Sequence, residues 1–259
     1  MMQTLWLCSV LTRRELSQRY RGTVLGALWP FLYSSLLLAM FTFVFSLVLK
    51  VRWSLGSDAR PNEGALMIFA GLVPYLFIAE VLTRSATCIT SVPNFVKKIR
   101  FPLMLLPIVV VNCALVLAAI NALILIAAAG LLWQNIPITT LMLPMLFVPL
   151  AALGLGLAFL FGALGVFFRD LSQVSPLLAQ LAMFMAPVCY PVSVVPPLFI
   201  AAIELNPITW FVGAFRDLVL DGRAVSLADW AEHTLVYIVF AVVAFAFFHR
   251  TRRTFADLL

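Results

Sequence analysis

Residues 103–132 read LMLLPIVVVNCALVLAAINALILIAAAGLL, and this stretch decides the fold class. It contains no Asp, Glu, Lys or Arg. A helix needs about 20 predominantly apolar residues to cross roughly 30 Å of bilayer hydrocarbon, and this stretch is longer than that. It therefore predicts a transmembrane helix that is long enough to cross the bilayer at a tilt.

Apolar stretches of similar character lie on both sides of it. Together they predict six spans, at about residues 31–49, 64–83, 103–132, 139–168, 174–195 and 230–248. Hydrophobic residues make up 64% of the 259-residue chain and charged residues 11%, whereas an average soluble domain carries about 25% charged residues. We therefore expect an all-α integral membrane protein, in which residues 1–259 form one membrane domain without a soluble catalytic module.

The positive charges fall mainly on one side of these predicted spans. If the N-terminus is cytoplasmic, the inner segments hold twelve Lys or Arg residues and the outer segments hold five. Cytoplasmic loops of membrane proteins are enriched in Lys and Arg. The bias predicts that both termini are cytoplasmic, and it explains the net charge of +6 without nucleic acid.

Residues 7–28 predict an amphipathic helix in the membrane interface, ahead of the first span. A helix with basic residues on one face and apolar residues on the other prefers that position, and Pro30 ends the pattern. The apolar face carries Leu16, Tyr20, Val24 and Leu28, and the polar face carries Arg14, Gln18 and Arg21. A cytoplasmic turn with solvated arginines is the alternative interpretation.

Four prolines interrupt the chain after the start of the fifth predicted span. They are Pro187, Pro191, Pro196 and Pro197. Proline breaks a helix, and non-helical backbone at membrane depth persists only where protein or a water-filled cavity covers it. We therefore predict short re-entrant helices between spans five and six, forming a gate on the outer side.

The chain carries little chemistry that could power or catalyse a reaction. A phosphate-binding loop needs a Lys followed by Ser or Thr, and none of the three lysines is followed by either. Glu80 lies inside the second predicted span, but Arg84 follows at the spacing that pairs opposite charges on a helix. The sequence therefore predicts a channel-forming bundle whose energy comes from a partner.

Several segments resemble those of one known family. They are RELSQRYRGTVLGALWPFL (14–32), AGLVPYLF (70–77), NFVKKIRFP (94–102), FFRDLSQVSPLL (167–178), PVCYPVSVVP (187–196) and NPITWFVGAFRDLVLDG (206–222). In this order they cover nearly the whole chain. They resemble the membrane subunits of type 2 ABC exporters of polysaccharides, most closely the O-antigen and lipopolysaccharide-precursor export permeases.

The resemblance implies a permease subunit rather than an enzyme, in the inner (cytoplasmic) membrane of a bacterial cell. Two copies would form the channel, and two copies of a separate ABC ATPase would bind ATP and Mg²⁺, so no cofactor or metal is expected on this chain. The substrate would be O-antigen on undecaprenyl pyrophosphate. Capsular polysaccharide and teichoic acid are the alternatives within the family.

The resemblance also implies a coupling helix and a channel. Coupling to the ATPase would involve a cytoplasmic helix between spans two and three, with Asn94, Phe95, Val96, Lys97, Lys98 and Arg100. Spans one and five are the channel helices of the family, and aromatic rings there can stack on sugar faces. The rings that we expect along the path are Trp29, Tyr33, Phe41, Phe45, Phe184 and Tyr190. Contact with lipid or neighbouring helices is the alternative for each ring.

Arginines near the N-terminus are the candidates for binding the anionic head group. Arginine makes bidentate contacts to phosphate. The four candidates are Arg13, Arg14, Arg19 and Arg21. They could instead fix the topology of the chain and touch anionic lipid.

Two functions of other classes remain open on the sequence. An ion-driven carrier would need charged groups at membrane depth, and Glu80 is the candidate for that role. A membrane glycolipid transferase would need acids or histidines that converge near an interface. The acids of the inner segments each lie beside arginine, which favours structural pairing over an activated base.

Overall fold

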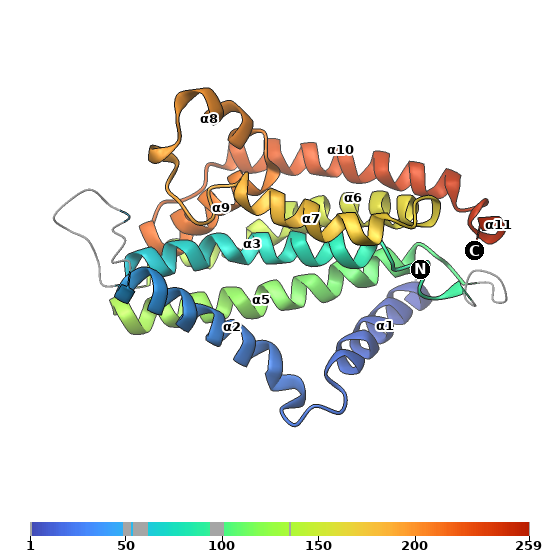
Figure 1. The fold of residues 1–259 in the computed structure, drawn as a ribbon, viewed down its shortest axis with the longest axis horizontal. Helices are drawn as coiled ribbons and strands as arrows, with labels where there is room; N and C mark the ends of the chain where they lie inside the picture. Colours follow the sequence, from blue (N-terminus) through green and yellow to red (C-terminus); the bar gives the residue numbers. More distant parts are fainter. Residues whose placement is uncertain (1, 49–52, 54–61, 94–100, 135, 259) are drawn as a thin grey trace.

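The computed structural model describes residues 2–48, 53, 62–93, 101–134 and 136–258, which contain helices and no strand (Figure 1). Five helices are long and apolar enough to cross a membrane. They are α2 (Trp29–Phe41) continued by the π-helix η2 (Thr42–Val48), α3 (Glu63–Ser85), α5 (Leu105–Trp133), α6 (Leu143–Phe167) preceded by the 3-10 helix η3 (Ile138–Met142), and α10 (Leu227–Thr251).

The other helical segments are shorter or more polar, and they lie at the ends and the side of this bundle. They are α1 (Met2–Tyr20), η1 (Gly26–Leu28), α7 (Leu171–Phe184), η4 (Val192–Val194), α8 (Pro197–Glu204), α9 (Pro207–Arg216), the π-helix η5 (Asp217–Asp221) and α11 (Phe255–Leu258).

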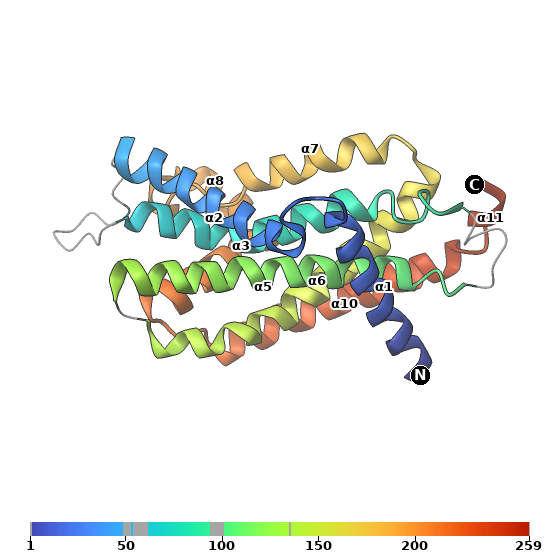
Figure 2. The same ribbon diagram turned by 90° about the horizontal axis from the view of Figure 1, so that it is seen from below.

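Both chain termini lie at the same end of the bundle, on the right of Figure 1. We call this the terminal end, and the end where α3 begins the distal end. The long helices α3, α5, α6 and α10 run side by side between the two ends in both views (Figures 1 and 2). The chain is therefore a multi-pass helical bundle.

Helix α3 forms the centre of the bundle, and α2 lies at its edge. In the apolar windows of the two spans, 78% of the residues of α3 are buried but only 6% of those of α2. Glycines let α6 come close to α3 and to the turn after it: a Cβ on Gly154 would lie 2.6 Å from the Phe77 ring, and one on Gly165 would lie 1.9 Å from the Ala86 carbonyl oxygen. Small residues permit such close helix contacts in lipid.

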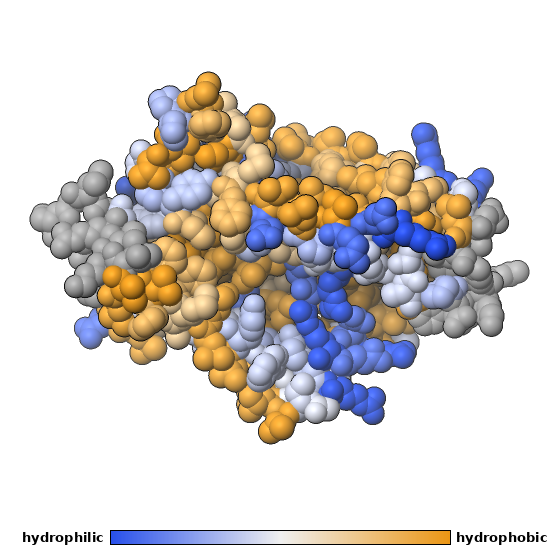
Figure 3. Space-filling view, in the orientation of Figure 1, coloured by the Kyte–Doolittle hydropathy of each residue, from blue (hydrophilic) through white to orange (hydrophobic). Residues whose placement is uncertain are grey.

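Helix α1 is shorter than the sequence predicts. It ends at Tyr20 rather than near residue 28, and Gly22 follows in the left-handed region with φ +86°. The periodicity continues to Leu28, but the chain turns at Gly22, a residue without the Cβ that penalises positive φ. Hydrophilic residues gather over this part of the surface, whereas apolar residues cover the flank formed by α2 and α7 (Figure 3).

The fifth predicted span, at about 174–195, differs from the structure. Helix α7 covers Leu171–Phe184, which is 14 residues, and a single helix needs about 20 to cross the hydrocarbon. The chain then turns at Pro187 and continues into α8 and α9 with η5, a pair bent by 93°. The structure thus has five single spans, or six if the bent pair counts as one.

Candidate functional site

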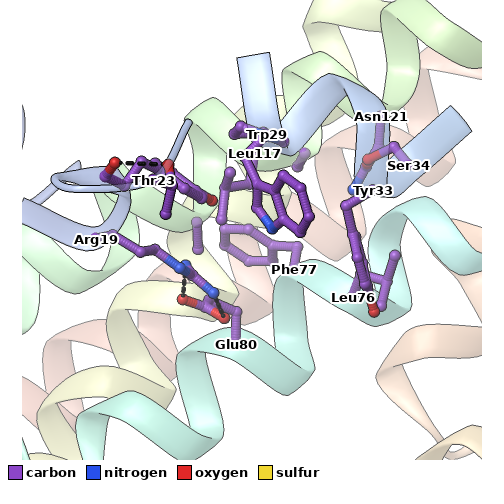
Figure 4. A pocket seen from close by; sticks show the side chains of 14 residues that line it. Arg19, Thr23, Trp29, Tyr33, Ser34, Leu76, Phe77, Glu80, Leu117 and Asn121 are labelled. Atoms are coloured by element: carbon purple, nitrogen blue, oxygen red, sulfur yellow. Dashed lines mark hydrogen bonds and ion pairs between the residues drawn. The ribbon is translucent and has the colours of Figure 1, made fainter. Parts of the chain in front are cut away.

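A cavity lies beside the C-terminal end of α1, where α2, α3 and α5 meet (Figure 4). Its volume is about 470 Å³. We call it the interface cavity; its walls carry Arg19, Tyr20, Thr23, Trp29, Pro30, Tyr33, Ser34, Leu76, Phe77, Glu80, Ala114, Leu117, Ala118 and Asn121. It combines a cation, an acid, three amphipathic aromatic rings and an amide within an apolar bundle.

An ion-pair network links α1 to α3 at one side of this cavity. Arg19 donates from both terminal nitrogens to Glu80, with Nη1–Oε1 at 2.6 Å and Nη2–Oε2 at 3.3 Å (Figure 4). Arg84 donates to Glu15 at 3.0 Å and to Glu80 at 3.4 Å. The predicted pairing of Glu80 with Arg84 is therefore present, and Glu80 shares its carboxylate with a second arginine.

The pairing with Glu80 stabilises the positive charge of Arg19. Partial burial lowers the pKa of the Arg19 guanidinium, but the hydrogen bond and the negative charge of Glu80 raise it by more, so the pKa lies above its usual value. Burial raises the pKa of the neighbouring Tyr20 hydroxyl. The side chain of Arg19 keeps 34% of its surface exposed. Arg19 is therefore a permanent cation that an anion from outside can reach.

The structure distributes the other three predicted head-group arginines around α1. Arg14 and Arg21 line a neighbouring hollow of about 790 Å³ between α1 and α5. Arg13 lines another hollow of about 490 Å³, formed with α5. All three side chains belong to exposed residues. Tyr20, Thr23 and Pro30 line both the interface cavity and the hollow of Arg14 and Arg21, so these two spaces are neighbours.

The predicted channel rings fall into three pairs. Trp29 and Tyr33 line the interface cavity, and both come from α2 (Figure 4). Phe41 and Phe45 are partly buried against the core and stack with their ring centroids 5.7 Å apart. Phe184 is exposed at the end of α7, and the Tyr190 hydroxyl donates to its carbonyl at 2.9 Å.

The predicted gate prolines occupy different environments. Pro187 is buried, Pro191 is half-buried, and Pro196 and Pro197 are exposed at the start of α8. Short helices follow them, as the sequence predicts. The predicted coupling residues Asn94, Phe95, Val96, Lys97, Lys98 and Arg100 lie outside the residues that the structure describes.

Sequence reasoning missed Ser34 and Asn121, and it placed Glu15 beside Arg14 in a structural pair, whereas the observed partner is Arg84. Ser34 donates a hydrogen bond to the Asn121 amide oxygen, which attaches α2 to α5 inside the bundle. A signal for the ion-pair network was available: Glu15 and Arg19 have the same order and spacing as Glu80 and Arg84. Two such helices that run in opposite directions bring each acid against the other helix's arginine, as observed. Ser34 and Asn121 carry no comparable pattern.

The chain matches the family model of the ABC-2 type transporter over residues 7–220. The chain is a member of this family. The match spans α1 from Leu7 onward, the residues that line the interface cavity, and the helices α7, α8 and α9. An ABC-2 permease is the transmembrane subunit of its transporter and not the ATPase, so it works with a separate ABC ATPase subunit.

Curated relatives resemble this ABC-2 permease over nearly their full length. An O-antigen export system permease protein RfbA from Myxococcus xanthus is 28% identical over 252 residues, which are 95% of this chain and 93% of the relative. Two proteins with the same name from Klebsiella pneumoniae are 26% and 24% identical. Each of these two alignments covers 98% of this chain and 95% of the relative.

Proposed function

We propose that this permease exports a lipid-linked polysaccharide, O-antigen on undecaprenyl pyrophosphate, from the cytoplasm to the periplasm. The observation that carries the proposal is the interface cavity, which joins the exposed cation Arg19 to the rings of Trp29 and Tyr33. The names of the relatives support the substrate class. Capsular polysaccharide or teichoic acid is the alternative cargo of the same machinery.

The chemistry of the cavity fits the two parts of such a substrate. Guanidinium groups bind pyrophosphate through bidentate, charge-assisted hydrogen bonds, and Arg14, Arg19 and Arg21 stand around neighbouring hollows. Aromatic rings such as Trp29 and Tyr33 offer an apolar face together with a polar tip. A sugar next to the pyrophosphate can therefore stack on a ring while the head group meets the arginines.

The terminal end of the bundle faces the cytoplasm in this proposal. Lys and Arg prevail in the segments that the sequence assigns to this side, and both termini lie at this end (Figure 1). The segment with Asn94, Phe95, Val96, Lys97, Lys98 and Arg100 then couples the permease to two ATPase subunits, which bind ATP and Mg²⁺. The distal end, with α8 and α9, becomes the periplasmic exit.

A homodimer completes the channel. Helix α2 has only Pro30 and Ser34 buried, and Tyr33 on it and Phe184 on α7 are 56% and 62% exposed. These helices therefore present aromatic rings at the side of the protomer. A second copy that faces them would enclose a path lined with rings, along which a long glycan can slide by weak, repeated stacking.

The ATPase activity of the purified permease–ATPase complex in lipid nanodiscs tests this proposal. We expect lipid-linked O-antigen to stimulate ATP hydrolysis more than undecaprenyl pyrophosphate without glycan. Replacing Arg14 and Arg21 together with Gln should raise the half-stimulating concentration at least about a hundredfold, because each lost charge-assisted hydrogen bond costs on the order of 1.5–3 kcal/mol.

The matched control removes two positive charges from the same end, with Arg250→Gln and Arg253→Gln near the end of α10. Both residues are exposed and neither lines the cavity. If the two double variants have equal effects, Arg14 and Arg21 only fix the topology of the chain and do not bind the head group. Stronger stimulation by lipid-linked capsular polysaccharide or teichoic acid would transfer the proposal to that substrate.

A further inference from the structure

Arg216 is a buried arginine at the distal end of the bundle. It lies at the end of α9 with 8% of its surface exposed. Its Nε donates to the Met67 carbonyl oxygen at 2.9 Å, and its Nη2 donates to the Val188 carbonyl oxygen at 2.7 Å. Its guanidinium carbon lies 4.7 Å from the centroid of the Trp53 ring. One side chain thus connects α9, the start of α3 and the turn that follows α7.

These contacts differ from ordinary ion pairs. The ion pairs Arg19–Glu80 and Arg84–Glu15 join α1 to α3, and the pair Arg84–Glu80 lies within α3. Arg216 instead uses backbone carbonyls, whose positions are fixed by the chain rather than by a rotatable side chain. A planar guanidinium holds its donors in a fixed, planar arrangement, whereas the three donors of an ammonium group rotate at the end of a flexible stem.

Gly71 provides the space that this side chain needs. A Cβ on Gly71 would lie 3.2 Å from Arg216 Nη2 and 3.3 Å from the Val188 Cα. Such distances are tighter than ordinary van der Waals contact, so a side chain there would press on both the guanidinium and the turn. The absence of a side chain at residue 71 lets α3 approach the arginine and the turn together.

The predicted gate region therefore has two parts of different character. The part held by Arg216 is buried: it comprises Ala186–Val188 and the core-facing side of α9, including Phe211 and Phe215. The part between them, from Val192 to Leu205, is mostly exposed, although Ile203 in α8 is buried. Leu198 and Leu205 are each 84% exposed, and Val194 is 65% exposed. Figure 1 shows α8 projecting from the bundle at the distal end.

We propose that Arg216 is a positioning residue of the distal gate: it holds the buried part against α3, so that opening takes place in the exposed part, η4 and α8. Pro191 and Pro196 flank η4, and Asn206 with Pro207 begins α9. The Asn206 side chain also donates to the Ala182 carbonyl at 3.1 Å, which fixes the far boundary of the exposed part. The proposal rests on the proposed function in treating the distal end as the exit.

The native Cys189 provides a reporter for the test, because it follows Val188 directly. Burial raises the pKa of its thiol, and the charge of Arg216 opposes this only in part. The other cysteines are poor competitors: Cys8 and Cys113 are buried, and burial raises the pKa of the Cys88 thiol to about 12. Cys189→Ser identifies the signal by removing it.

The experiment measures the rate at which a membrane-impermeant maleimide labels Cys189 in intact cells that carry the complete transporter. We expect slow labelling in the unmodified protein and an increase of about tenfold in Arg216→Gln, the change expected from losing one hydrogen bond to a charged group. Arg216→Lys should give an intermediate rate, because it keeps the positive charge but loses the fixed donor geometry of the guanidinium. Gly71→Ala should raise the rate with Arg216 intact.

A second reporter, Leu198→Cys in the Cys189→Ser background, monitors the exposed part. Its labelling rate should be the same with and without the Arg216→Gln substitution, and it should change during ATP-driven export while that of Cys189 stays constant. Unchanged labelling of Cys189 in the variants, or equal changes at both reporters, overturns the proposal. If Arg216→Gln does not reach the membrane, Arg216→Lys and Gly71→Ala decide the outcome.

Failure of the proposed function would have a different signature. If Cys189 is labelled faster in inverted vesicles than in intact cells, the distal end faces the cytoplasm and the proposed direction of export is wrong. The ratio of the Cys189 labelling rates of the variant and the unmodified protein in those vesicles would still decide whether Arg216 holds the turn.

Discussion

At the terminal end of the bundle Arg19 pairs with a carboxylate, whereas at the distal end Arg216 is held by two backbone carbonyls. Arg19 keeps 34% of its side-chain surface exposed, and Arg216 as a whole residue keeps 8%. Water and ions reach the first guanidinium but hardly the second. Arg19 is therefore a cation that can change its partner, whereas Arg216 is a cation that holds backbone segments in place.

The energies of the two contacts differ for the same reason. Exposed ion pairs contribute on the order of 0–1 kcal/mol, because solvent screens the charges. A phosphate that approaches Arg19 therefore has little to overcome in displacing Glu80. Removing the partner of a buried charge costs about 3–5 kcal/mol, so Arg216 cannot exchange its carbonyls for a ligand. A binding role suits the first arginine and a positioning role suits the second.

Charge reversal should give the largest difference between the two ends. Arg216→Glu places a carboxylate against the Met67 and Val188 carbonyl oxygens in a buried site, and we expect a loss of about 3–5 kcal/mol, the cost of an uncompensated buried charge. Arg19→Glu should cost less, because Arg19 keeps 34% of its side-chain surface exposed and Glu80 retains its contact with Arg84. Thermal unfolding in detergent and the amount of protein in the membrane measure both. Equal destabilisation by Arg216→Glu and Arg19→Glu would contradict the distinction between a binding and a positioning arginine.

Close helix packing at the terminal end offers the next largest effect. Gly165→Ala places a methyl group where the Ala86 carbonyl oxygen lies 1.9 Å away, and the backbone must shift at a cost of about 1–3 kcal/mol. Gly213→Ala in α9 is the matched control, since a Cβ there has no neighbour within 4 Å. Thermal unfolding should separate the two variants. The terminal end would then combine an adaptable ion pair with a rigid helix contact.

If Arg19 exchanges Glu80 for the substrate, replacing Arg19 and replacing Glu80 should change the half-stimulating concentration in opposite directions. Arg19→Gln should raise the half-stimulating concentration of lipid-linked glycan about tenfold, through the loss of a charge-assisted hydrogen bond. Glu80→Gln should lower it, because the substrate no longer competes with a carboxylate. The measurement is substrate-stimulated ATP hydrolysis by the complex. Complete loss of transport in Glu80→Gln, with an ion gradient as the driving force, would favour the ion-driven carrier.

The smallest effect is expected at the contact between Ser34 and Asn121. Interhelical hydrogen bonds in membrane proteins contribute about 0.6 kcal/mol on average, so Asn121→Ala should lower the free energy of unfolding by roughly that amount. Ser34→Ala should have a similar effect, and the double variant should not add the two losses. Additive losses would show that these side chains do not act as a pair.

The sequence predicted the long spans well, because an uninterrupted apolar run has no stable position other than a bilayer or a core. Helix α3, for example, covers Glu63–Ser85 where 64–83 was predicted. The ends of the interrupted helices were harder to predict. The amphipathic period continued past Gly22, and the prolines after α7 showed that the helix breaks without showing that it already ends at Phe184.

Contacts between distant residues depend on how helices are placed, and this limits what a single sequence can predict. The pairing of Glu80 with Arg84 follows from helical spacing alone. The pairing of Glu80 with Arg19 requires α1 to lie beside α3, and the carbonyl contacts of Arg216 require three segments to meet. Arginine near the N-terminus could be predicted to bind an anion, but the repeated Glu–Arg spacing identifies its competing carboxylate only once α1 is known to lie beside α3.

The most direct test of the central claim is transport by purified components in liposomes. Lipid-linked O-antigen is placed in the membrane, and its transfer across the bilayer is followed by accessibility of the glycan to an external glycosidase. We predict transfer only when this permease, its ABC ATPase and ATP are all present. Transfer by the permease alone, or by an ion gradient without ATP, would contradict the claim that the chain provides the channel while a partner provides the energy.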